Sequence, residues 1–221
     1  MTRIAAFTFN GFEENTYVLS DESGACVIID PGCSTPSEEQ ELASYIREHH
    51  LRPERLINTH CHIDHILGNA FVTEQWNLKP EAHRNEIPVL ESAEAIARAY
   101  GLPYRNSPPI AHFLEEGQSI RFGNTTLKLL FVPGHSPGHI ALYQPDEKFI
   151  LSGDVLFLGS IGRYDLPGSN FNELVHSIMN KLMKLPGEVK VYPGHGPSTR
   201  IDQEREKNPF IAEFAALKEN K

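Results

Sequence analysis

One run of seven residues, Thr59-His60-Cys61-His62-Ile63-Asp64-His65, places three imidazoles and a carboxylate just after an apolar, strand-like segment. If the chain is still extended there, His60 and His62 project from the same side, because side chains two apart on a strand share a face. The apolar spacing further on predicts a helix, which Asp64 and His65 would open. Two ligands from the extended part and two from the helix start predict a site with room for two metal ions.

Other candidate ligands follow apolar runs that stop at a glycine. His135, Asp154 and His195 each come directly after such a glycine. Proteins that layer helices on sheets bind ligands at converging strand ends, so these side chains could complete the site. A similar run ends at Asp30, which either orients a ligand histidine by accepting its free ring N–H or forms an ordinary Asp-Pro turn. His139, close to His135, has either a supporting or a purely structural role.

Composition limits the class of protein. A chain of 221 residues with 40% hydrophobic content predicts a single domain. A net charge of −9 argues against nucleic acid as a partner. We expect a cytoplasmic protein without a membrane partner, because no apolar run is long enough to span a bilayer and the N-terminus lacks a signal peptide's apolar core. The odd cysteine count, from Cys26, Cys33 and Cys61, predicts buried free thiols. Monomer and homodimer are both compatible with this sequence.

Hydrophobic periodicity predicts alternating strands and helices. The expected strands are residues 4–9, 15–20, 25–30, 55–59, 125–132, 139–144, 148–153 and 189–192. The expected helices are residues 37–50, 65–76, 89–100, 171–185 and 202–218. Ser37, which precedes two glutamates, is expected to cap the first helix.

The order of the candidate ligands, His60-x-His62-x-Asp64-His65 followed by three more far along the chain, resembles the metallo-β-lactamase superfamily. The resemblance implies an α/β (α+β) fold, the αββα sandwich of two mixed sheets face to face with helices outside, in one domain over residues 1–221. It also implies two divalent metal ions, with zinc expected and iron or manganese as alternatives. The implied ligands are His60, His62 and His135 for one ion and Asp64, His65 and His195 for the other, with Asp154 bridging.

The same comparison favours one branch of the superfamily. β-Lactamases of the commonest type carry a cysteine ligand where this chain has Asp154, which argues against antibiotic hydrolysis. Residues 159–168 and Asn208-Pro209-Phe210 resemble glyoxalase II, the hydroxyacylglutathione hydrolases, and their shorter relatives. Full-length glyoxalase II proteins continue into a helical domain that binds glutathione. Only 26 residues follow His195 here, so we expect no separate C-terminal glutathione-binding domain.

The resemblance implies hydrolysis of a small-molecule thioester, hydroxyacylglutathione or a related acyl thioester. A water bridging two metal ions would ionise near neutral pH and attack the carbonyl as hydroxide, while the metals stabilise the oxyanion and the departing thiolate. Asp64 and Asp154 are the expected catalytic carboxylates, and Asp64 would also align the water. Arg163 could bind a substrate carboxylate or pair with Asp165. Residues 97–117 could form a wall or lid over the site.

Two other functions are compatible with these residues. A persulfide dioxygenase of the same fold would use a single iron, held here by His60, His135 and Asp154, to oxidise a glutathione persulfide. It would leave a fully equipped second site without a role. A non-catalytic zinc module is the other alternative, although structural zinc sites are usually closed and rich in thiolates.

Overall fold

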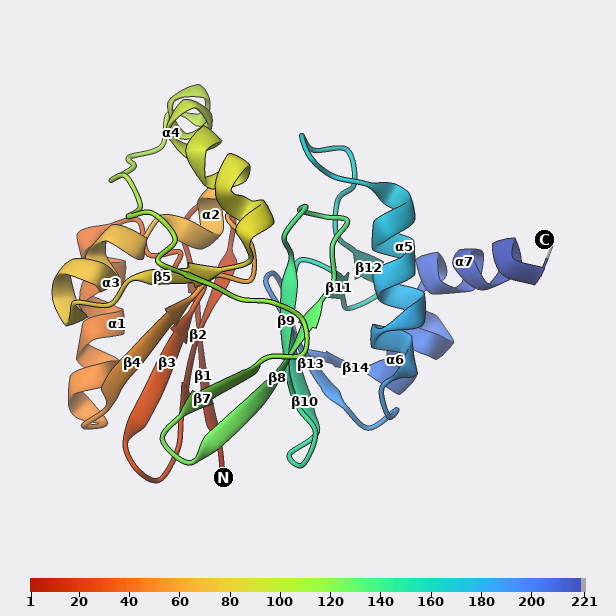
Figure 1. The fold of residues 1–221 in the computed structure, drawn as a ribbon, viewed down its shortest axis with the longest axis horizontal. Coiled ribbons are helices and arrows are strands. Elements are labelled where there is room, and N and C mark those ends of the chain that lie inside the picture. Colours follow the sequence, from red (N-terminus) through yellow and green to blue (C-terminus); the bar gives the residue numbers. More distant parts are fainter. Residues whose placement is uncertain (220–221) are drawn as a thin grey trace.

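Two six-stranded β-sheets pack face to face in the computed structural model, which describes residues 1–219 (Figure 1). The first sheet has the order β1-β2-β3-β4-β5-β6. Its first three strands pair antiparallel, and β3 to β6 pair parallel. The strands are β1 (Arg3–Phe9), β2 (Glu14–Ser20), β3 (Ala25–Ile29), β4 (Arg52–Ile57), β5 (Pro80–Ala82) and β6 (His112–Phe113).

The second sheet has the order β14-β13-β10-β9-β8-β7, and only β10 and β13 pair parallel among its described strands. Its strands are β7 (Ser119–Phe122), β8 (Thr125–Phe131), β9 (Ile140–Gln144), β10 (Phe149–Gly153), β13 (Lys190–Pro193) and β14 (Thr199–Arg200). A separate short hairpin joins β11 (Leu156–Phe157) to β12 (Ser160–Ile161).

Helices cover the outer face of each sheet (Figure 1). On the side of the first sheet lie α1 (Pro36–Glu48), α2 (Ile63–Ile66), α3 (Asn69–Trp76) and α4 (Ile87–Tyr100). On the side of the second lie α5 (Phe171–Asn180), α6 (Ile201–Lys207) and α7 (Pro209–Glu219). Single 3-10 turns form at Arg84–Glu86 and Leu182–Lys184.

The central strands are apolar on both faces because both faces are covered. On β3, Val27 and Ile29 face the core between the sheets, whereas Cys26 and Ile28 pack beneath α1 and α3. Strand β9 alternates in the same way between the inter-sheet core and the cluster beneath α5, α6 and α7. Side chains two apart share one environment, as the period of a strand requires. The predicted αββα sandwich of two mixed sheets is confirmed.

Three predicted helices are each interrupted. The segment 202–218 breaks at Asn208, because Pro209 lacks a backbone N–H and disfavours helical backbone in the residue before it. The segment 65–76 breaks at Leu67 and Gly68, and the Gly68 N–H donates to the Pro31 carbonyl at 2.8 Å instead of continuing the helix. The segment 171–185 ends its α-helix at Asn180 and continues as a 3-10 turn. The short strands β5, β6, β7, β11, β12 and β14 were not predicted from periodicity.

Thr35, not Ser37, caps the first helix. The Glu38 N–H donates to the Thr35 hydroxyl, and the Glu38 carboxylate accepts the Thr35 N–H, which completes a capping box. Pro36 then occupies the first helical position, where a missing N–H costs nothing.

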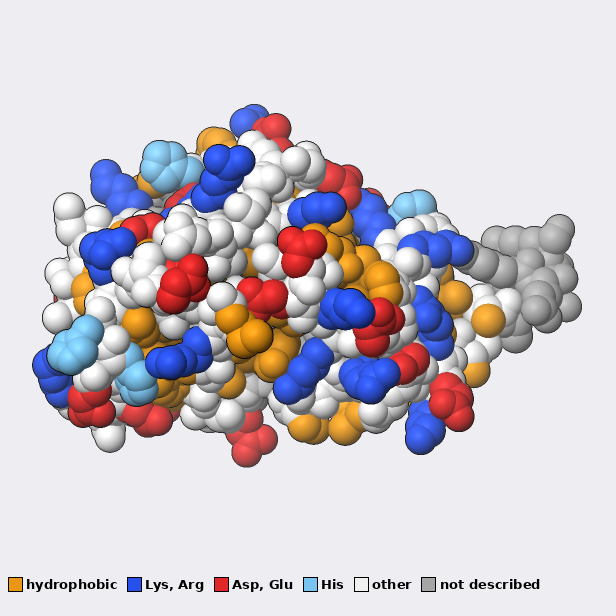
Figure 2. Space-filling model, turned by 90° about the horizontal axis from the view of Figure 1, so that it is seen from below, with side chains coloured by type: hydrophobic (Ala, Val, Ile, Leu, Met, Phe, Trp, Pro, Cys, Tyr) orange, Lys and Arg blue, Asp and Glu red, His pale blue; other side chains and the backbone are white. Residues whose placement is uncertain are grey.

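Strand direction brings the candidate ligands to one end of the molecule. Strands β8, β10 and β13 point the same way, so the loops after their carboxyl ends start at one edge of the second sheet. In Figure 1 that edge faces the top, beneath α2 and α4, while the β2–β3 and β7–β8 turns lie at the bottom. Figure 2 looks onto this lower end, where acidic and basic side chains are interspersed around exposed hydrophobic ones. Within residues 1–219, no helix is long and apolar enough to cross a membrane.

Candidate metal centre

Seven candidate ligands come from four loops and one helix start. The β4–α2 loop carries His60 and His62, and α2 itself carries Asp64 and His65. The loops after β8, β10 and β13 carry the remaining three, which are His135, Asp154 and His195. These strand ends converge, and the side chains form two neighbouring groups.

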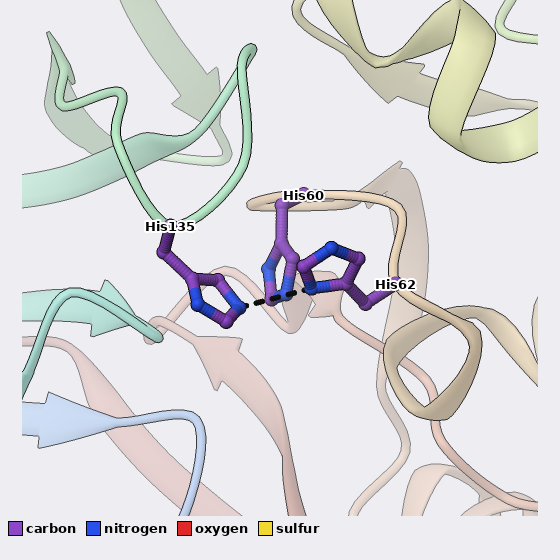
Figure 3. A group of neighbouring side chains, drawn as sticks. All are labelled: His60, His62 and His135. Atoms are coloured by element: carbon purple, nitrogen blue, oxygen red, sulfur yellow. Dashed lines mark hydrogen bonds between the residues drawn. The ribbon is translucent and has the colours of Figure 1, made fainter. Parts of the chain in front are cut away.

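The first group holds three histidines (Figure 3). Each of His60, His62 and His135 offers a ring nitrogen within 4.8 Å of the others. Nδ1 of His62 lies 2.9 Å from Nε2 of His135, the contact drawn as a dashed line, and the His60 ring lies beside both. His60 and His135 are buried and His62 is half-buried, and their three nitrogen donors point into one small volume.

The second group holds Asp64, His65 and His195, again with one ligand atom each within 4.8 Å of the others. Nε2 of His195 lies 3.1 Å from Oδ2 of Asp64, and Nε2 of His65 lies 3.7 Å from the same oxygen. The backbone approaches closely here, because a Cβ at position 194 would lie 2.7 Å from Cε1 of His65. Glycine before His195 is therefore required by the packing of the group itself.

Asp154 lies between the two groups. Its Oδ1 is 3.5 Å from Nε2 of His65, and its Oδ2 is 3.5 Å from Nε2 of both His135 and His195. One carboxylate therefore contacts ligands of the first group and of the second. This is the position that a bridging ligand would require.

The chemistry of the inward-facing atoms fits a metal. Nε2 of His60, Nε2 of His65 and Oδ1 of Asp154 are buried and have no hydrogen-bond partner. Buried polar atoms without partners are costly, so several of them at one point fit a bound cation. Histidine and carboxylate donors suit zinc, iron and manganese alike.

Outer hydrogen bonds fix the tautomers of two ligands. Nδ1 of His135 lies 2.9 Å from the Arg163 carbonyl, and Nδ1 of His195 lies 2.9 Å from the Phe12 carbonyl. A carbonyl can only accept, so Nδ1 carries a proton in both rings and Nε2 is the nitrogen that would bind a metal at the centre. Main-chain carbonyls therefore hold these two histidines in the form that binds a metal.

The two groups differ in charge. Burial, together with neighbouring imidazoles, lowers the pKa of His62 to about 3, and burial holds the pKa of His60 and His135 below their ordinary values. In the second group, burial opposes the charge on His195, but hydrogen bonds with Asp154 and Asp64 outweigh it and raise its pKa to about 10. The same two carboxylates raise the pKa of His65. Without metal, the first group is neutral and the second carries protons.

Glu86, a residue that sequence reasoning missed, ties together the two loops of the first group. Its side chain is fully buried just before α4 and accepts hydrogen bonds from the Cys61 N–H at 2.7 Å and the Gly138 N–H at 2.6 Å. It also accepts one from the Ser136 hydroxyl at 2.5 Å. Cys61 lies between two ligands and Ser136 follows a third. No spacing or motif around Glu86 indicates this role.

Asp30 and His139 contact the centre from behind. Oδ2 of Asp30 lies 3.2 Å from Nδ1 of His65, while the carboxylate accepts the N–H and hydroxyl of Thr59, both at 2.6 Å. Nε2 of His139 accepts the Asp154 N–H at 3.0 Å, and its ring stacks on His60. Both positions suit the supporting roles considered for these residues, and those roles remain proposals.

Glu14 is a second buried carboxylate that the sequence did not indicate. Its Oε1 lies 3.8 Å from Nδ1 of His65 and has no hydrogen-bond partner, while Thr16 donates a hydrogen bond to Oε2. Burial raises the pKa of Glu14 well above its ordinary range. Burial therefore disfavours the charged form of Glu14, which lies behind the second group.

A cleft of about 720 Å³ opens over the two groups. Five ligands form part of its lining, namely His62, Asp64, His135, Asp154 and His195. Of the segment 97–117, for which a wall or lid was one interpretation, only Tyr100 lines the cleft among the described residues, and α4 upstream of it forms the wall. Tyr104 packs into the apolar cluster behind α4 instead. Arg163 also lines the cleft, and its guanidinium pairs with Asp165 at 2.9 and 3.0 Å.

Comparison with known families supports this arrangement. The model of a family described as "Metallo-beta-lactamase superfamily" matches residues 10–195. That span covers most of the chain and includes all seven candidate ligands.

Three curated relatives match across most of the chain. The "Probable metallo-hydrolase YqgX" of Bacillus subtilis (strain 168) is 38% identical, over 90% of this chain and 92% of that protein. "Hydroxyacylglutathione hydrolase GloC" of Haemophilus influenzae is 34% identical, over 90% and 93%. The human "Persulfide dioxygenase ETHE1, mitochondrial" is 33% identical, over 89% and 70%.

Two solved structures superpose closely. BLEG-1, titled a B3 metallo-beta-lactamase, gives a TM-score of 0.86 at 34% identity, over 96% of this chain and 99% of that one. TTHA1623, titled as a di-iron-bound form, gives a TM-score of 0.84 at 39% identity, over 93% and 99%. With the histidine and aspartate clusters, these relatives support a metal-dependent hydrolase.

Proposed function

The chain belongs to the metallo-beta-lactamase superfamily, and we propose that within it this protein is a metal-dependent hydrolase that cleaves thioesters. One observation carries the proposal. Buried nitrogen and oxygen atoms of both groups have no partners of their own, and five of the seven candidate ligands line an open cleft. A purely structural metal site is usually closed, whereas this one can be reached by a small molecule.

The proposed ligands are those that the two groups suggest. His60, His62 and His135 would hold one ion. Asp64, His65 and His195 would hold the other, with Asp154 shared between them. Bound ions of this kind lower the pKa of water toward neutrality and polarise a carbonyl.

Asp64 would orient the attacking water. In the metal-free protein burial opposes its ionisation, but the positive charge of His65 outweighs burial and lowers its pKa. A cation held in place of that proton would favour the charged form likewise, so the carboxylate could accept a hydrogen bond from water at neutral pH. A thiol of pKa about 8.5 leaves as the thiolate without help from an acid. A thioester therefore needs no general acid from this chain.

The metal content and the substrate range test the proposal together. We expect about two metal ions per chain after purification without added metal, measured by mass spectrometry. A panel of thioesters, carboxylic esters and the β-lactam nitrocefin should show turnover of thioesters above all. Preferred turnover of nitrocefin would instead place the protein with BLEG-1 and overturn the proposal.

A persulfide dioxygenase is the second candidate, favoured by the 33% identity to the human persulfide dioxygenase. In this case His60, His135 and Asp154 would hold a single iron. About one iron per chain, with oxygen consumption on glutathione persulfide and no thioester turnover, would replace the hydrolase proposal.

A further inference from the structure

One wall of the cleft is a single stripe of α4. Pro88, Ser92, Ile96 and Tyr100 line the cleft at intervals of four residues, which places them on the same helix face. The neighbouring face of the helix packs into the protein through Ala93 and Ala97, both buried. This wall therefore offers a proline, an isoleucine and an aromatic ring to a bound molecule, with the hydroxyls of Ser92 and Tyr100 among them.

The rest of the lining continues this apolar character. Phe157 and Leu166 line the cleft across from α4, and Phe12 lines it from the β1–β2 turn. The Phe12 and Tyr100 rings meet edge to face with centroids 5.9 Å apart, so the turn and the end of α4 touch. A chain extending away from the metal groups would pass between apolar side chains.

Charged partners for a substrate are scarce in the cleft. Apart from the candidate metal ligands, Arg163 is the only charged residue among the described residues that line it. Its guanidinium is already paired with Asp165, and both side chains are 65% exposed. A glutathione thioester carries two carboxylates and an ammonium group, and binding it tightly would require several charged partners.

We propose that the cleft selects thioesters with an uncharged apolar acyl chain over glutathione thioesters. This inference rests on the proposed thioester hydrolysis and specifies its substrate class. The scissile carbonyl would lie at the two ligand groups and the acyl chain along α4, where burial of each methylene contributes binding.

Two matched comparisons of the metal-loaded enzyme test this selectivity. In the first, acetyl, butanoyl, hexanoyl and octanoyl thioesters of the neutral thiol N-acetylcysteamine should show kcat/KM rising by up to about fourfold per methylene. In the second, the lactoyl thioester of N-acetylcysteamine should be cleaved at least as well as lactoylglutathione. A flat chain-length profile, or a preference for the glutathione thioester of about tenfold or more, would overturn the inference and leave thioester hydrolysis intact.

A pair of neighbouring substitutions locates the effect on α4. Tyr100→Ser should lower the octanoyl-to-acetyl ratio of kcat/KM by about threefold, because an exposed aromatic wall is lost. Ala99→Ser, on the same turn but outside the cleft lining, should leave that ratio unchanged. Tyr100 is 63% exposed, so its replacement does not disturb the core. Equal ratios in the two variants would remove α4 from the binding site.

Binding of acyl hydroxamates tests the apolar preference of the cleft independently of thioester hydrolysis. If no thioester is cleaved, the metal-loaded protein should still bind octanohydroxamate more tightly than acetohydroxamate, by calorimetry. That result would reject thioester hydrolysis and support the apolar preference of the cleft. Equal affinities for the two hydroxamates would reject the preference as well.

Discussion

The two ligand groups each contain three candidate metal ligands, but they differ in protonation when no metal is bound. The group of His60, His62 and His135 is neutral, because burial lowers the pKa of every ring in it. The group of Asp64, His65 and His195 holds its own protons, which neutralise two nearby carboxylates. A metal entering the first group displaces no proton, whereas a metal entering the second must displace at least one.

The difference indicates separate metal affinities for two sites that share Asp154. The neutral group should keep its ion over a wide pH range, while the charged group competes with protons for its ion. The supporting contacts also divide. Glu86 joins only loops of the first group, and the Phe12 carbonyl holds only His195 of the second. Glu86 and the β1–β2 turn therefore each act on one group, whereas Asp30 and the shared Asp154 contact both.

Removal of the shared carboxylate should have the largest effect. In Asp154→Ala, loss of ~4 kcal/mol of transition-state stabilisation would reduce thioester turnover about a thousandfold, together with metal content. Steady-state kinetics and metal analysis of the same sample measure both. Unchanged thioester turnover in this variant would contradict the hydrolase assignment.

Loss of Glu86 should weaken only the first group. In Glu86→Ala, three buried donors lose their acceptor, and the metal affinity of the first group should fall about 10- to 100-fold, as with other groups that support ligands. Competition with a chelator measures the two affinities separately. Glu86→Gln is the matched control, since it keeps the shape of the side chain and one accepting oxygen. The metal affinity of the first group should fall less in this variant than in Glu86→Ala. Equal losses at both groups would show that Glu86 supports the fold as a whole.

Lower pH should weaken the second group selectively. His195 has a pKa of about 10 without metal, so near neutral pH its proton must leave before the ring can bind. Below that pKa, if metal binding releases one proton, the affinity for the second metal should fall about tenfold for each unit by which the pH decreases. The first group, with pKa values below neutrality, should change little between pH 8 and pH 7. Calorimetric titrations at both pH values provide the comparison, and equal slopes would contradict it.

The Arg163 side chain should matter least. It is exposed and paired with Asp165, and exposed ion pairs contribute about 0.2–1 kcal/mol. Its contact with His135 runs through the backbone carbonyl, which Arg163→Ala retains. We expect kcat/KM for neutral thioesters to change by less than about threefold. A large rise in KM for charged thioesters alone would instead assign Arg163 to substrate binding.

The ligand groups were predictable because each candidate lies next to a feature that the local sequence shows, such as the end of a strand. His135, Asp154 and His195 follow strand ends marked by glycine, and the His60 to His65 run lies between a strand and a helix. The directions of the strands then bring these ligand-bearing ends together. The αββα layering was implied by the family resemblance, and the alternation of apolar runs agrees with it.

The supporting residues could not be predicted because their contacts are distant in sequence. Glu86 accepts hydrogen bonds from residues 25 and 52 positions away, and nothing in its neighbours marks it. The break at Gly68 depends on a contact with Pro31, which periodicity cannot show. The helix over 89–100 was expected, but which of its faces meets the cleft depends on the packing of Ala93 and Ala97 against a separate part of the chain.

Through Phe12, the β1–β2 turn both holds a candidate metal ligand and lines the cleft. Its carbonyl accepts from Nδ1 of His195, while its ring forms part of the cleft wall against Tyr100. A longer or looser turn would make room for bulkier substrates only by releasing the ring of His195. Relatives that act on other substrates and keep the ion bound by His195 should therefore retain the length of this turn. Their differences should lie along α4, whose side chains contact the cleft without holding any ligand.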